Sequence, residues 1–127
     1  MKKGILGHPC RPYLTRLPDD LIYIDDVLDA VRRALFTEKP LSRAYNIAFD
    51  KTFDNQDLED SIRKALPEIS FDIGKHPHAA TVGAHRDRDP LDLTRAKEDL
   101  NWTPTIDLEN GIVRIAAWLK SRANRVK

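Results

Sequence analysis

The sequence of 127 residues has little cysteine, little glycine and almost no net charge. Its single cysteine, Cys10, excludes an internal disulfide and a cysteine-rich zinc site. It is compatible with a reducing compartment, and we predict a cytoplasmic protein. The 21 lysines and arginines nearly balance the 20 aspartates and glutamates, so no overall field attracts nucleic acid or a membrane surface. Any function therefore has to come from a local site.

Long apolar runs are also absent, so no segment is predicted to cross a membrane as a helix. Met1-Lys2-Lys3 is similar to the basic start of a secretory leader, but the apolar stretch that follows stops at Gly7-His8-Pro9 and is too short for one. The length fits one domain. We predict an irregular N-terminal segment at 1–20, an α/β domain at 21–122 and a basic tail at 123–127.

What is present is an alternation of short apolar runs with amphipathic helical patterns. The predicted strands are 21–24, 44–49 and 69–73. The predicted helices follow Asp25, Asp54 and Asp107, and a short one spans about 94–100. Strands that alternate with helices predict an α/β fold, with a small mixed or parallel sheet and helices packed against it.

Local signals mark the ends and the buried faces of these helices. Asp25 and Asp54 are predicted N-caps, Phe53 and Leu58 flank Asp54 as a hydrophobic staple, and Asn101 suits a left-handed helix end. The apolar residues predicted to be buried are Val27, Leu28, Ala30, Val31, Ala34 and Leu35 in the first helix, Leu58, Ile62, Ala65 and Leu66 in the second, and Leu108, Ile112, Ile115, Ala116 and Leu119 in the last.

Four motifs resemble a known family. They are Leu21-Ile22-Tyr23-Ile24-Asp25-Asp26-Val27, Ala44-Tyr45-Asn46-Ile47, Pro90-Leu91-Asp92-Leu93-Thr94-Arg95-Ala96 with Leu100-Asn101-Trp102-x-Pro104, and Leu108-Glu109-Asn110-Gly111-Ile112 followed by Trp118. In order and spacing they are similar to segments of the NAD-dependent epimerase/dehydratase family, the extended short-chain dehydrogenases/reductases. The resemblance covers about residues 21–120. It implies the C-terminal, substrate-binding half of such a protein, which holds a nucleotide-sugar.

The cofactor and catalytic signatures of that family are missing from this sequence. A dinucleotide fingerprint needs a strand followed by closely spaced glycines. Only Met1-Lys2-Lys3 precede Gly4, so no strand leads into Gly4 and Gly7. Cys10 stands where the third glycine is needed. The family's Tyr-x-x-x-Lys pair is absent too, because Leu17, Val27 and Phe49 follow the three tyrosines at that spacing. We therefore predict no catalytic residue, no cofactor site and no metal in this chain, with NAD(P) implied for a full-length relative.

The resemblance implies four substrate-binding residues. The family places an arginine just before its D-x-(S/T)-(K/R)-A helix to grip the nucleotide diphosphate, and Arg88, helped by Arg86, matches it; a planar guanidinium suits a bidentate contact to phosphate. Lys51 and Leu21 complete the set. A second family arginine is replaced here by Asp19, whose carboxylate repels a diphosphate.

Each of these residues also has a plain structural interpretation. Alternating arginines and aspartates near Arg86 and Arg88 can be a solvated surface of ion pairs, and Lys51 can be an exposed turn lysine. Asp25 and Asp26 fit a helix start better than an acid–base pair. Trp102 and Trp118 fit a core better than a stacking site. His76, His78 and His85 lack the further ligands that a zinc site needs.

The sequence leaves two functions open. The first is the substrate-binding portion of an NAD-dependent nucleotide-sugar epimerase/dehydratase-like protein, which binds the small molecule but is inactive alone. The alternative is a non-enzymatic interaction module that forms a homodimer or docks to a separate dinucleotide-binding half, because a separated half exposes apolar surface. Neither nucleic acid nor a membrane is a predicted partner.

Overall fold

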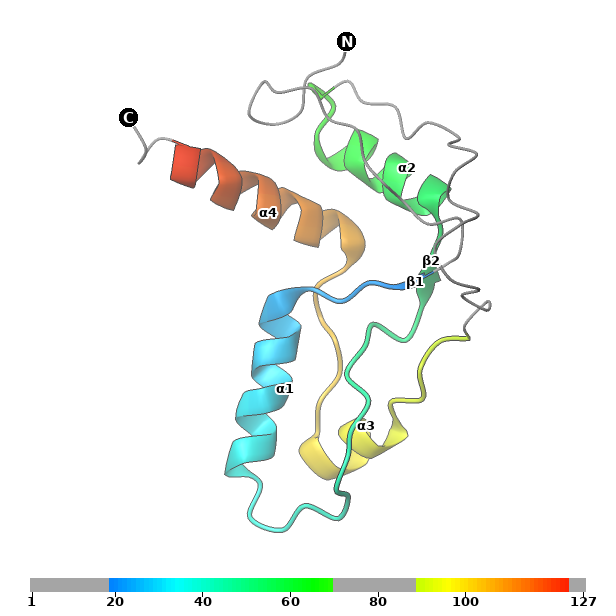
Figure 1. Ribbon diagram of the computed structural model, residues 1–127, viewed down its shortest axis with the longest axis vertical. Helices are drawn as coiled ribbons and strands as arrows, with labels where there is room; N and C mark the ends of the chain where they lie inside the picture. The colour runs from blue at the N-terminus through cyan, green and yellow to red at the C-terminus, as the bar shows by residue number, and fades with distance from the viewer. Residues whose placement is uncertain (1–18, 70–88, 124–127) are drawn as a thin grey trace, which may run out of the picture. The chain divides into compact units, whose positions relative to one another are not determined.

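The computed structural model describes residues 19–69 and 89–123. In chain order they form β1 (Asp19–Asp20), α1 (Ile24–Phe36), β2 (Thr52–Phe53), α2 (Asn55–Ala65), α3 (Thr94–Leu100) and α4 (Leu108–Ala123) (Figure 1). These residues divide into two compact units. We call Asp19–Phe53 with 89–108 the α1–α3 unit, and 54–69 with 109–123 the α2–α4 unit. The described elements confirm a small mixed α/β fold.

The strands pair antiparallel, with Asp19 opposite Phe53 and Asp20 opposite Thr52. Parallel pairing, which the sequence pattern allowed, is not found in the part of the chain that the structure describes. The apolar run at 44–49 forms no ladder there; instead it places Ala48 in the core, with Tyr45 and Ile47 packed against that core. The apolar residues at 44–49 are thus buried against the core without pairing to another strand. Most of the predicted strand at 69–73 lies outside the described residues.

The core of the α1–α3 unit is built around Trp102. Its buried residues are Ala30, Ala48, Leu93, Ala96, Leu100 and Trp102. Helices α1 and α3 lie side by side (Figure 1). Ala30 and Ala96 are almost fully buried, and such small side chains let two helices approach closely. Trp102, predicted as a core residue, is confirmed at 1% exposure.

Three of the four predicted helix signals are confirmed. Asp54 caps α2 through a capping box, in which its Oδ1 accepts from the Asp57 amide at 2.8 Å and Asp57 Oδ2 accepts from the Asp54 amide at 3.1 Å. α3 ends at Asn101, whose φ of 49° is left-handed. α4 follows Asp107 as expected. The prediction for Asp25 is wrong: α1 begins at Ile24, after Tyr23, so Asp25 lies in its first turn, where a carboxylate complements the helix dipole.

The predicted buried face of α1 is also wrong. Of its six residues only Ala30 is buried and Val27 half-buried, whereas Leu28, Val31 and Leu35 are 58%, 49% and 76% exposed. The core is reached instead through Asp26 and Ala30. Periodicity located an apolar face but could not show which neighbour covers it. For α2 the prediction holds, because Leu58, Ile62 and Ala65 are half-buried and Leu66 is buried.

Ion pairs link the described parts of the α2–α4 unit. Lys64 Nζ lies 2.5 Å from Glu109 Oε2, and Lys120 Nζ lies 3.4 Å from Glu68 Oε1. Ala116 of α4 is buried. Trp118 is not a core residue as predicted; it is 53% exposed and lies under the Arg122 guanidinium, 5.0 Å from the ring centroid.

No helix within 19–69 and 89–123 combines the length and the apolar character needed to cross a bilayer.

Candidate functional site

The two-stranded ladder brings two of the predicted substrate-binding residues together. Asp20 pairs with Thr52, so Leu21, which follows Asp20, and Lys51, which precedes Thr52, leave the ladder at the same end. Both side chains are exposed. The sequence pattern alone does not link these positions, which are 30 residues apart. The antiparallel register of β1 and β2 brings them to the same end. We call this part of the α1–α3 unit the ladder end.

Aromatic rings and a tight turn fix the surroundings of Lys51. Its Nζ lies 5.0 Å from the centroid of the Phe53 ring, and the rings of Phe49 and Phe53 are 5.5 Å apart. Asp50 turns the chain with a φ of 68°, and its carboxylate accepts from Lys97 Nζ at 2.8 Å. The left-handed region is uncommon outside glycine but is reached by aspartate. The turn therefore presents the Lys51 ammonium beside an aromatic face, in a cation–π contact.

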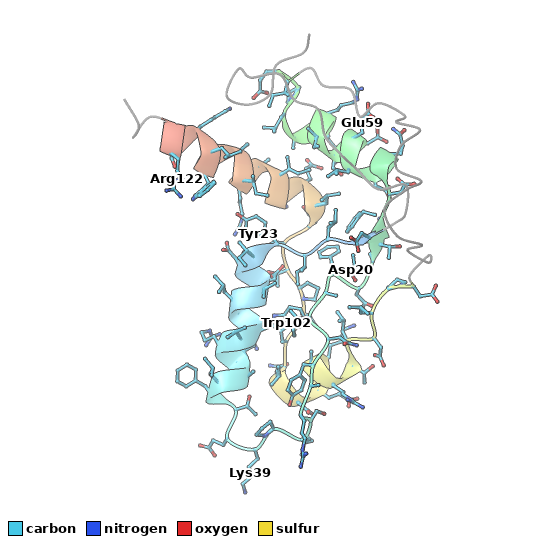
Figure 2. All side chains as sticks on the ribbon, in the orientation of Figure 1. Asp20, Tyr23, Lys39, Glu59, Trp102 and Arg122 are labelled. Carbon is cyan, nitrogen blue, oxygen red and sulfur yellow. The ribbon has the colours of Figure 1, made fainter. Side chains whose placement is uncertain are left out.

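Asp20 is a candidate that the sequence interpretation missed. Its Oδ1 accepts from the Phe49 amide at 2.6 Å (Asp20 is labelled in Figure 2). Its Oδ2 is buried and has no hydrogen-bond partner among the described residues, so one carboxylate oxygen at the ladder end is left unsatisfied there. Two consecutive acidic residues before Leu21 were the available signal, but only Asp19 was considered.

The described charges of the ladder end do not by themselves favour an anion. Lys51 contributes one positive charge, whereas Asp19, Asp20 and Asp50 carry carboxylates, of which Asp50 is paired with Lys97. Asp19 is exposed, and its Oδ1 accepts from the Asp20 amide at 3.0 Å. A diphosphate at this place therefore depends on further cations. The predicted cations Arg86 and Arg88 lie outside the described residues, as do His76, His78 and His85.

The chain segment next to the predicted arginines is anchored on the same unit. Asp92 accepts through Oδ1 from the Thr94 amide at 2.9 Å and from the Thr94 hydroxyl at 2.6 Å. The Thr94 hydroxyl bond, followed by the Thr94 amide, holds the pKa of Asp92 below its usual range. Asn46 Nδ2 donates to the Asp92 carbonyl oxygen at 2.9 Å. Position 88 therefore lies four residues before a point fixed to the segment that leads into Lys51.

Two of the motifs that carry the family resemblance contact each other directly. In addition to the Asn46 bond, Tyr45 Oη donates to Asp99 Oδ2 at 3.1 Å. The Tyr-Asn pair thus holds the start and the end of α3 against residues 44–49. The motif is structural here, because its polar atoms are used within the unit.

We expect Tyr45 to titrate at higher pH than an ordinary phenol. Burial, followed by the hydrogen bond to Asp99, raises the pKa of Tyr45 above that of an ordinary phenol. The neutral form of Tyr45 is favoured in the folded state. The hydroxyl group therefore contributes fully to stability below the pKa of Tyr45 in the unfolded chain, and this contribution is lost as pH rises through its pKa in the folded chain. Spectrophotometric titration should show a late phenolate step that Tyr45→Phe removes and Tyr23→Phe retains. A late phenolate step that persists in Tyr45→Phe would contradict this assignment.

Asp25 and Asp26 have separate structural roles and do not form an acid–base pair. Asp26 is only 4% exposed and accepts from the Thr105 amide at 3.1 Å, the Thr105 hydroxyl at 2.8 Å and the Ile106 amide at 2.9 Å. Its own carbonyl oxygen accepts from Trp102 Nε1 at 3.1 Å. The buried carboxylate thus joins α1 to the segment after Trp102. No group of three His, Cys, Asp or Glu within the described ranges could hold a metal ion.

Comparison with known proteins confirms the resemblance seen in the motifs. The chain is 27% identical over 97 residues to a dTDP-glucose 4,6-dehydratase of Streptomyces griseus, an alignment that covers 76% of this chain and 28% of the relative. It also matches the crystal structure of a UDP-glucose 4-epimerase from Thermotoga maritima, solved with UDP-glucose, with a TM-score of 0.72 and 23% identity. That match covers 94% of this chain and 37% of the epimerase. No protein-family model matches the chain.

Both matched proteins are NAD-dependent epimerases/dehydratases of the extended short-chain dehydrogenase/reductase family. The chain spans about a third of their length.

Proposed function

We propose that this chain, which resembles part of the NAD-dependent epimerases/dehydratases, is the nucleotide-sugar-binding portion of an enzyme of that type. The observation that carries the proposal is the match of nearly the whole chain to part of an epimerase solved with UDP-glucose. The sequence match to a dehydratase named for another nucleotide-sugar, dTDP-glucose, supports the same class of ligand.

In the proposed complex the ligand lies at the ladder end. Arg88, helped by Arg86, holds the diphosphate through charge-assisted hydrogen bonds, and Lys51 adds a third cation. Leu21 contributes an apolar contact.

In this proposal the 127-residue chain does not carry out the epimerase or dehydratase reaction alone. The sequence holds neither the glycine fingerprint nor the Tyr-x-x-x-Lys pair, and relatives of this kind use NAD. We propose that a dinucleotide-binding portion outside these 127 residues supplies the cofactor and the catalytic groups. The residues of this chain bind and orient the substrate.

Arg88→Ala is expected to weaken binding of UDP-glucose about 10-fold to 100-fold, because one bidentate charge-assisted contact is lost. Isothermal titration calorimetry with the intact chain measures it. Arg43→Ala, which removes an exposed arginine of the α1–α3 unit, is the matched control and should bind as the unmodified chain does. Equal affinities for the Arg88 and Arg43 variants would remove Arg88 from the proposal, and no binding by the unmodified chain would end it.

Asp19→Arg should tighten UDP-glucose binding about 10-fold. The change removes a carboxylate that repels a diphosphate and restores the arginine that the family resemblance implies at this position. Asp19→Asn separates the two effects, because it removes the charge alone and should give a smaller gain. The same calorimetric titration measures both. A loss of affinity in Asp19→Arg, in a variant that still folds by circular dichroism, would place the diphosphate elsewhere.

A further inference from the structure

The turn at Asp50 has an unusual backbone. Among the residues that the structure describes, two that are not glycine have a positive φ, Asp50 at 68° and Asn101 at 49°. Asn101 follows α3, and a left-handed residue is common at the end of a helix. Asp50 ends no helix; it precedes β2. Because the left-handed conformation is unfavourable for a residue with a side chain, it persists where the surrounding structure holds it, and such positions gather at functional sites.

A lysine of α3 holds this turn. Lys97 Nζ lies 2.8 Å from Asp50 Oδ2, although the two residues are far apart in the sequence. Lys97 follows Ala96, which is fully buried in the core of the α1–α3 unit, so the backbone of Lys97 is fixed. In Figure 1 the segment at 44–49 passes beside α3 before it reaches β2, and the Tyr-Asn pair attaches it there. The ion pair extends this attachment to the turn itself.

The turn decides where Lys51 points. Lys51 stands between Asp50 and Thr52, and Thr52 is fixed opposite Asp20 in the ladder. The backbone of Lys51 is thus set by the ladder on one side and by the left-handed turn on the other. With Asp50 in an ordinary conformation the chain would enter β2 from another direction. The Lys51 ammonium would then leave the Phe53 ring, whose centroid is 5.0 Å from it.

The ion pair also controls the charge that Lys51 offers. Asp50 is the neighbour of Lys51 in the sequence, and its carboxylate, if unpaired, would compete with a bound anion for the ammonium and would repel that anion. Lys97 takes up this carboxylate. The side chains of Lys97 and Asp50 are 43% and 47% exposed, and ion pairs exposed to this extent contribute little to stability. The pair is therefore better explained by its effect on Lys51 than by stabilisation of the fold.

We propose that Lys97 is a positioning residue of the nucleotide-sugar site, which acts through Asp50 on Lys51 and does not itself contact the ligand. The inference rests on the proposed function, in which Lys51 adds a cation to the diphosphate. Lys97 is not among the four residues that the family resemblance implies, and it reaches the turn from a helix that supplies none of them.

Lys97→Ala should weaken binding of UDP-glucose by the intact chain about 5-fold, the effect of one exposed charge contact. Lys97→Arg should restore most of the affinity, because a guanidinium can still pair with Asp50. Isothermal titration calorimetry measures the dissociation constants, and urea unfolding should show unchanged stability in both variants. Lys39→Ala, at an exposed lysine of the same unit, is the matched control and should bind as the unmodified chain does. Equal dissociation constants for Lys97→Ala and Lys39→Ala would overturn the role of Lys97.

Asp50→Gly separates positioning from a direct contact. Glycine adopts the left-handed conformation without a side chain to hold it, and the carboxylate is removed, so this variant should bind UDP-glucose at least as tightly as the unmodified chain. In the Asp50→Gly background, Lys97→Ala should change the dissociation constant less than about 2-fold, because Lys97 no longer has a partner to hold. A loss that stays at about 5-fold would mean that Lys97 acts on the ligand directly, and would overturn the proposal.

A measurement without ligand keeps this inference separate from the proposed function. The Lys51 side-chain protons that lie over the Phe53 ring are shifted upfield by its ring current. In proton NMR spectra, Lys97→Ala should move these resonances toward their ordinary positions, whereas Lys97→Arg and Lys39→Ala should not. Unchanged Lys51 resonances in Lys97→Ala would overturn the inference alone. Absence of UDP-glucose binding by the unmodified chain would instead end the proposed function, and with it the role of Lys97 in binding.

Discussion

Asp26→Ala is expected to lower the free energy of unfolding of the α1–α3 unit by about 3 kcal/mol, because the amides of Thr105 and Ile106 and the Thr105 hydroxyl lose a charged acceptor in a largely buried place. Removing one partner of a buried hydrogen bond costs more than the bond contributes, since the remaining group is left without water. Urea unfolding followed by tryptophan fluorescence measures the change, as Trp102 donates to the backbone of this same residue.

The neighbouring Asp25→Ala is the matched control for this result. Asp25 is exposed in the first turn of α1, where its carboxylate complements the helix dipole, so its loss should cost less than about 1 kcal/mol. Asp26→Asn should fall between the two, because one amide oxygen remains as an acceptor. Equal stability of Asp26→Ala and Asp25→Ala would show that the contact between α1 and the segment at 105–106 does not hold the unit together.

Trp102→Ala is expected to have the largest effect on stability, a loss of about 3–5 kcal/mol, which is most of the stability of a small domain. Trp102 is 1% exposed, lies beside α1 (Figure 2) and donates from Nε1 to the Asp26 carbonyl oxygen at 3.1 Å. Trp102→Phe keeps most of the apolar contact and loses the hydrogen bond, so it should cost about 1–2 kcal/mol.

Trp118→Ala is the corresponding control, because the same side chain is removed from a place that is 53% exposed. Its cost should be below about 1 kcal/mol, with loss of the contact to Arg122. Chemical denaturation of all three variants checks the order. A Trp118→Ala variant less stable than Trp102→Ala would contradict the position of the core.

The local part of the fold could be predicted from the sequence. Capping by Asp54, the left-handed end at Asn101 and the start of α4 depend on a few neighbouring residues, and each was identified from type and spacing. Trp102 was recognised as a core residue because it follows a helical apolar stripe. These signals are short-range, so they do not require knowledge of what packs against them.

The parts that were wrong depend on contacts between distant residues. Asp25 looked like a cap because it precedes an apolar pattern, but the N-cap is Tyr23, two residues earlier. The deciding interaction is that of Asp26 with residues 105 and 106. The buried face of α1 was assigned to Leu28, Val31 and Leu35, whereas the small Ala30 contacts the core. Periodicity gives a direction relative to the helix, and it does not tell which of two faces meets the core.

The candidate site shows the same division. Leu21 and Lys51 were chosen through the family resemblance, and the ladder of β1 and β2 brings them to one end. The Oδ2 of Asp20, which has no hydrogen-bond partner among the described residues, was not foreseen, because the bond of the other oxygen to Phe49 joins residues far apart in the sequence. Arg86 and Arg88 lie outside the described residues and stay a prediction. Whether Arg86 and Arg88 supply the positive charge that a diphosphate needs is therefore measured by binding in solution.

The measurement that tests the central claim most directly is a titration of the ¹⁵N-labelled chain with UDP-glucose, followed by the backbone amide resonances. The account predicts saturable shifts at Leu21, Lys51 and the amides next to them, together with Arg86 and Arg88. Resonances of α2 and α4 should stay in place. Absence of saturable shifts, or shifts confined to α2 and α4, would contradict nucleotide-sugar binding at the ladder end.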